Sequence, residues 1–140
     1  MKVCKIFRFD AAHFLPGYEG KCNAMHGHTW TLEVEAKGLA GKDGMVMDFA
    51  LLKRYVCTSV IEVLDHTLLN NLVKMPTCEN MLLWIAERLR KPNVLPPHDL
   101  TWNEVDMTTH TVFIGNVPVV RLKLSETPDS FAELDIPRHE

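Results

Sequence analysis

Alternating apolar and polar residues predict a strand over residues 2–13. Side chains alternate across a strand, and the odd-numbered face of this segment gathers apolar residues together with one histidine. The residues on that face are Val3, Phe7, Phe9, Ala11 and His13. A second alternation covers residues 28–36, with Trp30, Leu32, Val34 and Ala36 on one face. The segment between the two strands, LPGYEGKCNAM, contains a proline and two glycines and is expected to be a loop.

The middle of the chain changes to helical spacing. Residues 45–47 (MVM) predict a short strand, after which Asp48 can cap a helix that runs to about Leu64. The apolar stripe of that helix is expected to consist of Phe49, Leu52, Val56, Val60 and Val63. Thr77 is expected to cap a second helix, which ends at Pro92.

The last part of the chain returns to strands. Residues 93–111 look irregular, and the segments TVFIG and VPVVRLKLSE predict a hairpin that turns at Gly115 and Asn116. With strands at both ends and helices between them, the order predicts an α+β fold. We expect an antiparallel sheet with two helices on one face, in a single domain over residues 1–140.

Composition and charge restrict the functional classes. The chain has 140 residues, 46% hydrophobic residues and a net charge of −3, and it shows no basic cluster. We therefore expect neither a nucleic-acid partner nor a membrane partner. The first ten residues lack the continuous apolar core of a signal peptide, and the four cysteines form no CxxC pair. We expect reduced thiols and a cytoplasmic protein.

Three histidines are candidates for a metal site. His26 and His28 stand two residues apart at the start of a strand, so their side chains point to the same side. His13 ends the first strand, and an adjacent antiparallel strand would bring it beside the pair. Three imidazoles suit a zinc ion with one open coordination position, as in catalytic zinc sites. Alternatively, the two rings of H-x-H are simply hydrogen-bonded at a strand edge.

Cys22 lies four residues before His26, and three interpretations remain open. As a fourth zinc ligand it would close a structural site. Near the metal but not bound to it, its thiolate would be favoured and could act as a general base. It could also be an ordinary free thiol.

Other polar residues permit both a functional and a structural interpretation. Asp65 could orient the imidazole of His66, although the pair could equally end a helix. Glu126 ends the apolar stripe of the last strand, where a carboxylate is costly without a partner such as a ligand with two parallel N–H groups. The segment PTCEN could bind a ligand edge through Thr77 and the exposed N–H groups, or merely start a helix with Glu79 in its first turn.

The motifs together, in order, resemble one family. FDAAHFL, CNAMHGHTW, MDF, LDHTLLN, PTCEN and LSETPDSFAEL are similar to segments of the 6-pyruvoyl-tetrahydropterin synthase family, most of all its bacterial 6-carboxy-tetrahydropterin synthase branch of queuosine biosynthesis. The short spacing between Cys22 and His26 favours that branch. Two features depart from the family pattern: residues 93–116 are longer than expected, and Cys78 stands where Ser or Thr is usual.

The resemblance implies a role for each candidate. His13, His26 and His28 would bind Zn²⁺, while Cys22, Asp65 and His66 would transfer protons. Glu126 would grip the amino-pyrimidine edge of a pterin, helped by Thr77, Cys78 and Glu79. The implied substrate is 7,8-dihydroneopterin triphosphate, with zinc acting as a Lewis acid on its side-chain hydroxyls.

The resemblance also implies the products and the assembly. Triphosphate and acetaldehyde would be released and a 6-carboxy-tetrahydropterin formed. Subunits would join into a β-barrel homo-oligomer, a hexamer built as a dimer of trimers, with active sites between subunits. The alternatives are pyruvoyl-tetrahydropterin formation, side-chain cleavage of dihydroneopterin, and a non-catalytic structural zinc module.

Overall fold

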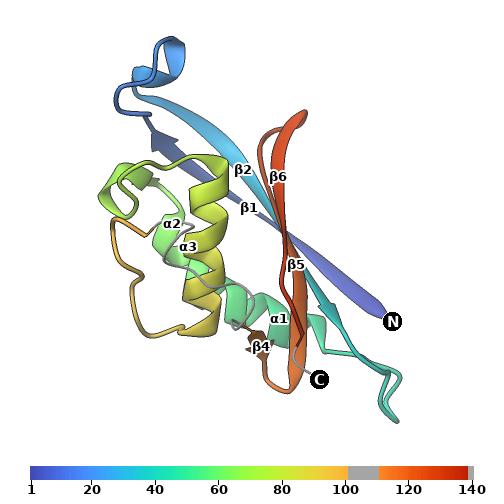
Figure 1. The fold of residues 1–140 in the computed structure, drawn as a ribbon. Helices are drawn as coiled ribbons and strands as arrows, with labels where there is room; N and C mark the ends of the chain where they lie inside the picture. The colour runs from blue at the N-terminus through green and yellow to red at the C-terminus, as the bar shows by residue number, and fades with distance from the viewer. Residues whose placement is uncertain (101–110, 139–140) are drawn as a thin grey trace.

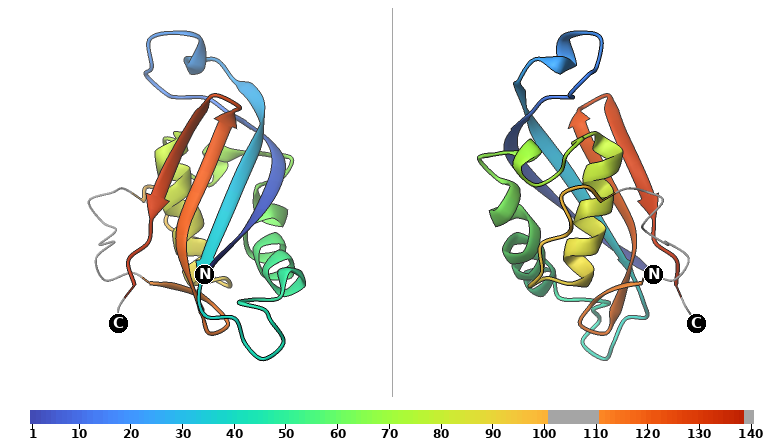
Figure 2. Two further views of the ribbon diagram at one scale, coloured as in Figure 1. Left: turned by 90° about the vertical axis from the view of Figure 1, so that its right-hand side faces the viewer. Right: turned by 60° about the vertical axis from the view of Figure 1, so that its left-hand side comes forward.

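The chain folds into a curled sheet with helices packed against one of its faces (Figures 1 and 2). The structure is a computed structural model that describes residues 1–100 and 111–138. Over these residues the strands are β1 (Lys2–His13), β2 (His26–Lys37), β3 (Thr67–Leu68), β4 (Val112–Ile114), β5 (Val117–Thr127) and β6 (Ser130–Asp135). The helical segments are η1 (Lys21–Asn23), α1 (Phe49–Val56), η2 (Cys57–Ile61), α2 (Glu62–Leu64), η3 (Leu69–Asn71) and α3 (Cys78–Arg90). The predicted α+β class is confirmed.

The two predicted N-terminal strands pair along their whole length. β1 and β2 are antiparallel, from Lys2 opposite Lys37 to His13 opposite His26. Their apolar faces turn together towards the helices, and Phe9 stacks on Trp30 with nearly parallel rings. Because the register is continuous, it brings the histidines at the end of β1 and at the start of β2 side by side. This pairing positions the candidate metal site.

The sheet is mixed, whereas the sequence predicted a purely antiparallel one. Its strand order is β3-β1-β2-β5-β4, with β6 also paired to β5. β3 runs parallel to β1 through Thr67 and Leu68, and this two-residue strand is too short to produce a periodic signal. β6 was not predicted either. The hairpin at Gly115 and Asn116 is confirmed, and Gly115 takes a positive φ of 61°.

The predicted strand over residues 45–47 is wrong. Val46 and Met47 are buried, which explains the apolar signal, but their backbone lies in a bend. Gly41 N donates to Met45 O at 2.9 Å, so this segment closes a turn before the helix. The expected cap follows, since Ala50 N donates to the Asp48 carboxylate at 2.8 Å.

The first helix contains a π-helical turn, η2, that shifts its buried stripe. The fully buried residues of the helix are Leu52, Val56, Val60 and Leu64. Of the residues predicted for the stripe, Phe49 is exposed and Val63 is half-buried. An α-helix turns about 100° per residue, so Leu64 would lie about 120° around the axis from Leu52. The extra residue of a π turn removes most of that offset. The helix therefore buries Leu64 and ends there, so that Asp65 and His66 lie at the edge of β1.

The second helix, α3, follows its prediction closely. Thr77 caps it by accepting a hydrogen bond from Asn80 N at 3.1 Å, and its last residue, Arg90, stands just before Pro92. The expected irregular backbone is present over residues 93–100, and the rest of that segment, up to residue 110, lies outside the described residues. Among the helices of the described ranges, none is long and apolar enough to cross a membrane.

Candidate functional site

Three imidazoles converge where β1 ends and β2 begins. The ligand nitrogens of His13, His26 and His28 all lie within 4.8 Å of one another. His13 is 1% exposed, while the other two are half-buried and open to one side. The antiparallel register places His13 directly opposite His26, and the two-residue period of β2 puts His28 on the same face. The structure thus brings together the three residues predicted to bind zinc.

The hydrogen bonds of these rings favour a bound cation. His13 Nδ1 lies 2.8 Å from Pro76 O, and His26 Nδ1 lies 2.8 Å from Ala24 O. Carbonyls only accept, so each Nδ1 carries the hydrogen and each Nε2 keeps a lone pair in the neutral ring. Yet the two Nε2 atoms are 3.0 Å apart, and the buried His28 Nε2 has no hydrogen-bond partner. Converging lone pairs without a donor fit a metal ion, and carbonyls on the other nitrogen are the usual outer partners of metal-binding histidines.

Burial keeps two of the rings neutral. Loss of solvent lowers the pKa of His13 below its ordinary value, and the same cause lowers the pKa of His28. Neighbouring Glu126 opposes the shift in both cases, but burial is the larger effect. Since only neutral imidazole can ligate a metal, this shift extends the pH range in which the site can bind one.

One aromatic ring, that of Trp30, packs against the histidine cluster, and the sequence did not predict this contact. The indole of Trp30 meets the rings of His13 and His28 edge-on, at centroid distances of 5.0 and 5.4 Å. Trp30 is fully buried, and its Nε1 donates to Ala11 O at 3.2 Å. Its place on the face of His26 and His28 was visible in the alternation, but that pattern gives no hint of ring contact.

Cys22 lies in η1, within the loop between β1 and β2, at the same end of the sheet as His13 and His26 (Figure 1). Its carbonyl accepts from Leu15 N at 2.8 Å, which folds the loop back on itself. The thiol is half-buried and does not belong to the group of converging metal-ligand atoms. This placement suits an open three-histidine site better than a closed one with four ligands.

Asp65 and His66 form a second group, at the edge of β1. His66 Nδ1 lies 3.0 Å from the Asp65 carboxylate, while the other Asp65 oxygen accepts from Asp10 N at 2.9 Å. That backbone hydrogen bond is the main reason why the pKa of Asp65 is lowered. His66 adopts a φ of 59°, rare for a residue other than glycine, and its N–H donates to Asp10 O at 2.6 Å. Backbone pairing to β1 thus fixes the pair.

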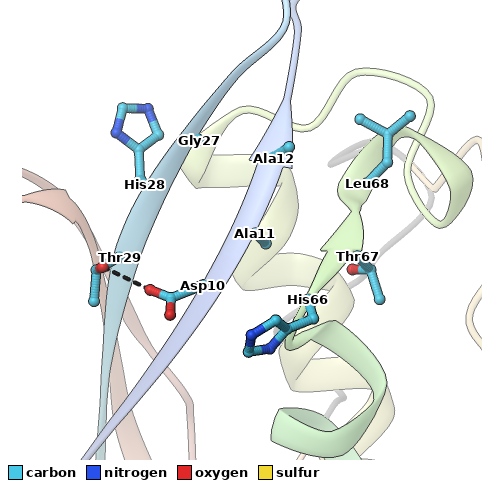
Figure 3. Close-up of a pocket in the computed structure, with 9 residues that line it drawn as sticks. All are labelled: Asp10, Ala11, Ala12, Gly27, His28, Thr29, His66, Thr67 and Leu68. Atoms are coloured by element: carbon cyan, nitrogen blue, oxygen red, sulfur yellow. Dashed lines mark hydrogen bonds between the residues drawn. The ribbon is translucent and has the colours of Figure 1, made fainter.

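A hollow of about 600 Å³ lies beside this pair on the outer face of β1 and β2. His66 and His28 are both among its lining residues, but Figure 3 shows the His28 ring directed away from His66. Asp10 and Thr29 also line it, and Thr29 Oγ1 donates to the Asp10 carboxylate at 2.6 Å. Sequence interpretation missed both residues. Only their positions on the polar faces of two adjacent strands could have suggested that they lie together.

The four predicted substrate-binding residues line one cavity of about 370 Å³: Thr77, Cys78, Glu79 and Glu126. The β5–β6 turn adds Asp129, so the lining found among the described residues includes three carboxylates and no lysine or arginine. Glu126 lies at the boundary with the histidines, because its Oε1 is 3.2 Å from His13 Nε2 and 3.7 Å from His28 Nε2. The cavity therefore suits a ligand edge rich in hydrogen-bond donors and opposes an anionic group.

The thiol of Cys78 points into the protein and donates a hydrogen bond there. Its Sγ donates to Leu124 O at 2.9 Å, and burial raises its pKa to about 12. The thiol therefore stays protonated at neutral pH and connects the first residue of α3 to β5. From this position, Cys78 can offer a ligand its backbone more readily than its side chain.

Comparison with known proteins gives a consistent result. Residues 2–137 match the family described as 6-pyruvoyl tetrahydropterin synthase. The 6-carboxy-5,6,7,8-tetrahydropterin synthase of Haemophilus influenzae is 32% identical, over 94% of this chain and 96% of its own length. The dihydroneopterin monophosphate aldolase of Pyrococcus furiosus is 47% identical, over 65% of this chain and 78% of its own length.

A solved structure supports the same relationship at the level of the fold. The 6-pyruvoyl tetrahydropterin synthase of Caenorhabditis elegans superimposes with a TM-score of 0.69, at 24% identity, over 96% of this chain and 94% of that one. The sequence match extends over almost the whole chain and includes the strands, helices and loops that carry the candidate site. The chain belongs to the 6-pyruvoyl tetrahydropterin synthase family.

Proposed function

We propose that this protein is a zinc-dependent 6-carboxy-tetrahydropterin synthase. It would convert 7,8-dihydroneopterin triphosphate and one water molecule into 6-carboxy-5,6,7,8-tetrahydropterin, acetaldehyde and triphosphate, as a lyase of queuosine biosynthesis. The observation that carries the proposal is the contact of two sites at Glu126, where a three-histidine cluster meets a cavity lined by carboxylates. A pterin needs both features, since its amino-pyrimidine edge donates hydrogen bonds and its side chain must react nearby.

Each residue of the site has a distinct proposed task. Glu126 accepts two parallel N–H groups of the pterin, and a charged acceptor makes such a pair stronger and more directional. Thr77 and Glu79 add contacts at the start of α3. His13, His26 and His28 hold the zinc ion, which supplies Lewis acidity to the substrate's side-chain oxygens. Three neutral imidazoles leave one coordination position free, as in catalytic sites.

Proton transfer is the proposed role of Cys22 and of the Asp65–His66 pair. Cys22 lies in the loop that joins His13, at the end of β1, to His26, at the start of β2, and takes a proton as general base. His66 returns or accepts a proton through Nε2, because Asp65 holds the Nδ1 side of the ring. The triphosphate projects away from the carboxylate cavity, where like charge would oppose it.

We propose a homo-oligomeric β-barrel, a hexamer made of two trimers, with active sites between subunits. Within the described chain, one edge of β1 pairs with β2 along its whole length. Its other edge pairs with β3 only at Ala11 and Ala12 and is otherwise open. Among the strands of the described residues, β6 pairs with β5 alone. Two open edges on opposite sides of one sheet favour head-to-tail pairing between copies. The four cysteines are free, which supports a cytoplasmic location.

A second candidate function follows from the similarity to the archaeal aldolase. Cleavage of the bond between the first two side-chain carbons of a dihydroneopterin phosphate would leave a hydroxymethyl pterin and release a phosphorylated two-carbon aldehyde. The same cavity and histidines could hold that substrate. The two reactions differ in the bond that breaks and in the fate of the phosphate.

Product analysis distinguishes these functions. The purified protein should be incubated separately with dihydroneopterin triphosphate and dihydroneopterin monophosphate, and the products identified by mass spectrometry. We expect acetaldehyde and a 6-carboxy-tetrahydropterin from the triphosphate. A hydroxymethyl pterin would instead establish the aldolase, and a pyruvoyl side chain without acetaldehyde would place the protein with the pyruvoyl synthases. The absence of turnover with both substrates would refute the proposal.

A further inference from the structure

Glu126 is shared between the histidine cluster and the carboxylate-lined cavity. Its side chain is 28% exposed and lines the cavity together with Thr77 and Ser130. At the same time Oε1 approaches the Nε2 atoms of His13 and His28, at 3.2 and 3.7 Å. One carboxylate therefore stands within reach of two different binding partners.

Towards two of the three histidines, Oε1 stands at the distances expected of an additional metal ligand. Ligand atoms at the usual distances from one tetrahedral zinc ion lie roughly 3.3–3.6 Å apart. The two distances from Oε1 to the histidine nitrogens fall close to that range. Because His13 Nδ1 already donates to Pro76 O, its Nε2 has no hydrogen to offer Glu126 in the neutral ring. The approach of a carboxylate to that lone pair is favourable when a cation lies between them.

Glu126 approaches the cluster from one side only. The group whose ligand atoms lie mutually within 4.8 Å contains the three histidines and not Glu126. A small rotation of the long Glu side chain would bring its oxygen onto the metal, and the opposite rotation would direct it into the cavity. Such a residue can exchange between the two sites.

We infer that Glu126 is an exchangeable zinc ligand, which occupies the open coordination position while the cavity is empty and leaves it when a pterin binds. The inference rests on the proposed function, because the pterin edge is the competing partner of the carboxylate. Departure of Glu126 would free the coordination position at the moment when substrate arrives. Binding of the pterin ring would thus prepare the metal for the side chain.

Reciprocal linkage makes the inference measurable. Consider a pterin that binds Glu126 but cannot reach the metal. If its binding removes Glu126 from the zinc ion, it must lower the affinity of the protein for zinc, and zinc must lower the affinity of the protein for this pterin by the same factor. Replacement of Glu126 by Gln should weaken zinc binding to a similar extent, because an amide oxygen carries no charge. Loss of one supporting partner of a metal site typically lowers its affinity about tenfold or more.

The experiment uses the intact chain loaded with Co²⁺, whose visible absorption reports the ligands, and with Zn²⁺ for affinity. The probe is 2-amino-4-oxopteridine, which has the pterin edge but no side chain. Wild type, Glu126→Gln and Asp129→Asn are compared with and without this probe. Asp129 is the matched control, because it lines the same cavity and loses the same charge but makes its side-chain contacts with Thr127 and Ser130.

We expect the probe to change the Co²⁺ spectrum of the wild type and of Asp129→Asn towards that of Glu126→Gln, and to weaken their zinc binding about tenfold. An identical Co²⁺ spectrum and zinc affinity in wild type and Glu126→Gln would overturn the inference. Titration calorimetry on the same samples measures the binding of the probe, and so tests the proposed function separately. If the probe does not bind the wild type, pterin recognition fails, while the comparison of the probe-free proteins still decides whether Glu126 is a ligand.

Discussion

The Nε2 atoms of His13 and His26 lie 3.0 Å apart, although the Nδ1 atom of each ring already faces a backbone carbonyl. In neutral rings this arrangement points two lone pairs at each other. A cation between them removes the repulsion, and β-sheet register alone forces the two rings together. The site is therefore preorganised for a metal by the backbone, and its ligand set can be tested directly.

Metal content tests whether Cys22 belongs to that ligand set. We expect one zinc ion per chain in the purified wild type and in Cys22→Ala, because the thiol lies outside the converging group. His28→Gln should lose most of its zinc, since an amide is a poor zinc ligand. Elemental analysis of the three proteins measures this. Loss of zinc from Cys22→Ala would favour a closed structural site with four protein ligands.

The metal-free protein should lose stability as the pH falls below about 6.5, the ordinary pKa of histidine. Burial lowers the pKa of His13 and His28 in the folded state, so the unfolded chain binds more protons in this range. This contribution to stability is complete above the unfolded pKa and disappears as the pH falls towards the folded values. Urea unfolding after chelation, at about pH 7.5 and 5.5, measures the effect. His28→Gln should show a smaller dependence, and an equal slope in both proteins would contradict the assignment.

Catalytic variants separate binding from proton transfer. Cys22→Ala should bind zinc and substrate normally but turn over about 10²–10⁴ times more slowly, the usual contribution of a positioned general base. Asp65→Asn should also be slow with an unchanged KM, because His66 loses the acceptor that orients its ring. Steady-state kinetics with dihydroneopterin triphosphate provide the measurement. Full activity of Cys22→Ala would exclude the thiol as the base.

The π turn makes a specific prediction about stability. Leu64→Ala should lower the free energy of unfolding by about 2–5 kcal/mol, the usual cost of removing a buried leucine side chain. Val63→Ala should cost less, about 1 kcal/mol, because Val63 is only half-buried. An uninterrupted α-helix would reverse this order. Denaturant unfolding of the two variants therefore tests the phase of the helix.

The open edges of β1 and β6 predict an oligomer in solution. Multi-angle light scattering at micromolar concentration should give a mass several times the 16.0 kDa of one chain, and six times that mass for a dimer of trimers. Phe131→Pro, in β6, should lower the mass, because proline removes a backbone donor from an edge strand. A monomeric wild type would contradict the proposed barrel and any active site shared between subunits.

Local patterns in the sequence were enough to predict much of this fold. The alternation in β1 and β2, the caps at Asp48 and Thr77, and the turn at Gly115 each depend on residues close together in the chain. The same alternation placed His26 and His28 on one face and put His13 at the end of the neighbouring strand. Side-chain direction is fixed by the local backbone, so strand periodicity by itself identifies the candidate metal ligands.

Contacts between distant residues could only be decided by the tertiary structure. The parallel pairing of β3 with β1 fixes Asp65 and His66 through the backbone of Asp10, more than fifty positions away. The π turn shifts the helix so that Leu64 is fully buried in the core, whereas Val63 is only half-buried against it. The approach of Glu126 to the histidines and the bond from Cys78 to Leu124 also join separate segments. Such contacts depend on how elements pack and on which buried polar atoms must find partners, and no short stretch of sequence contains that information.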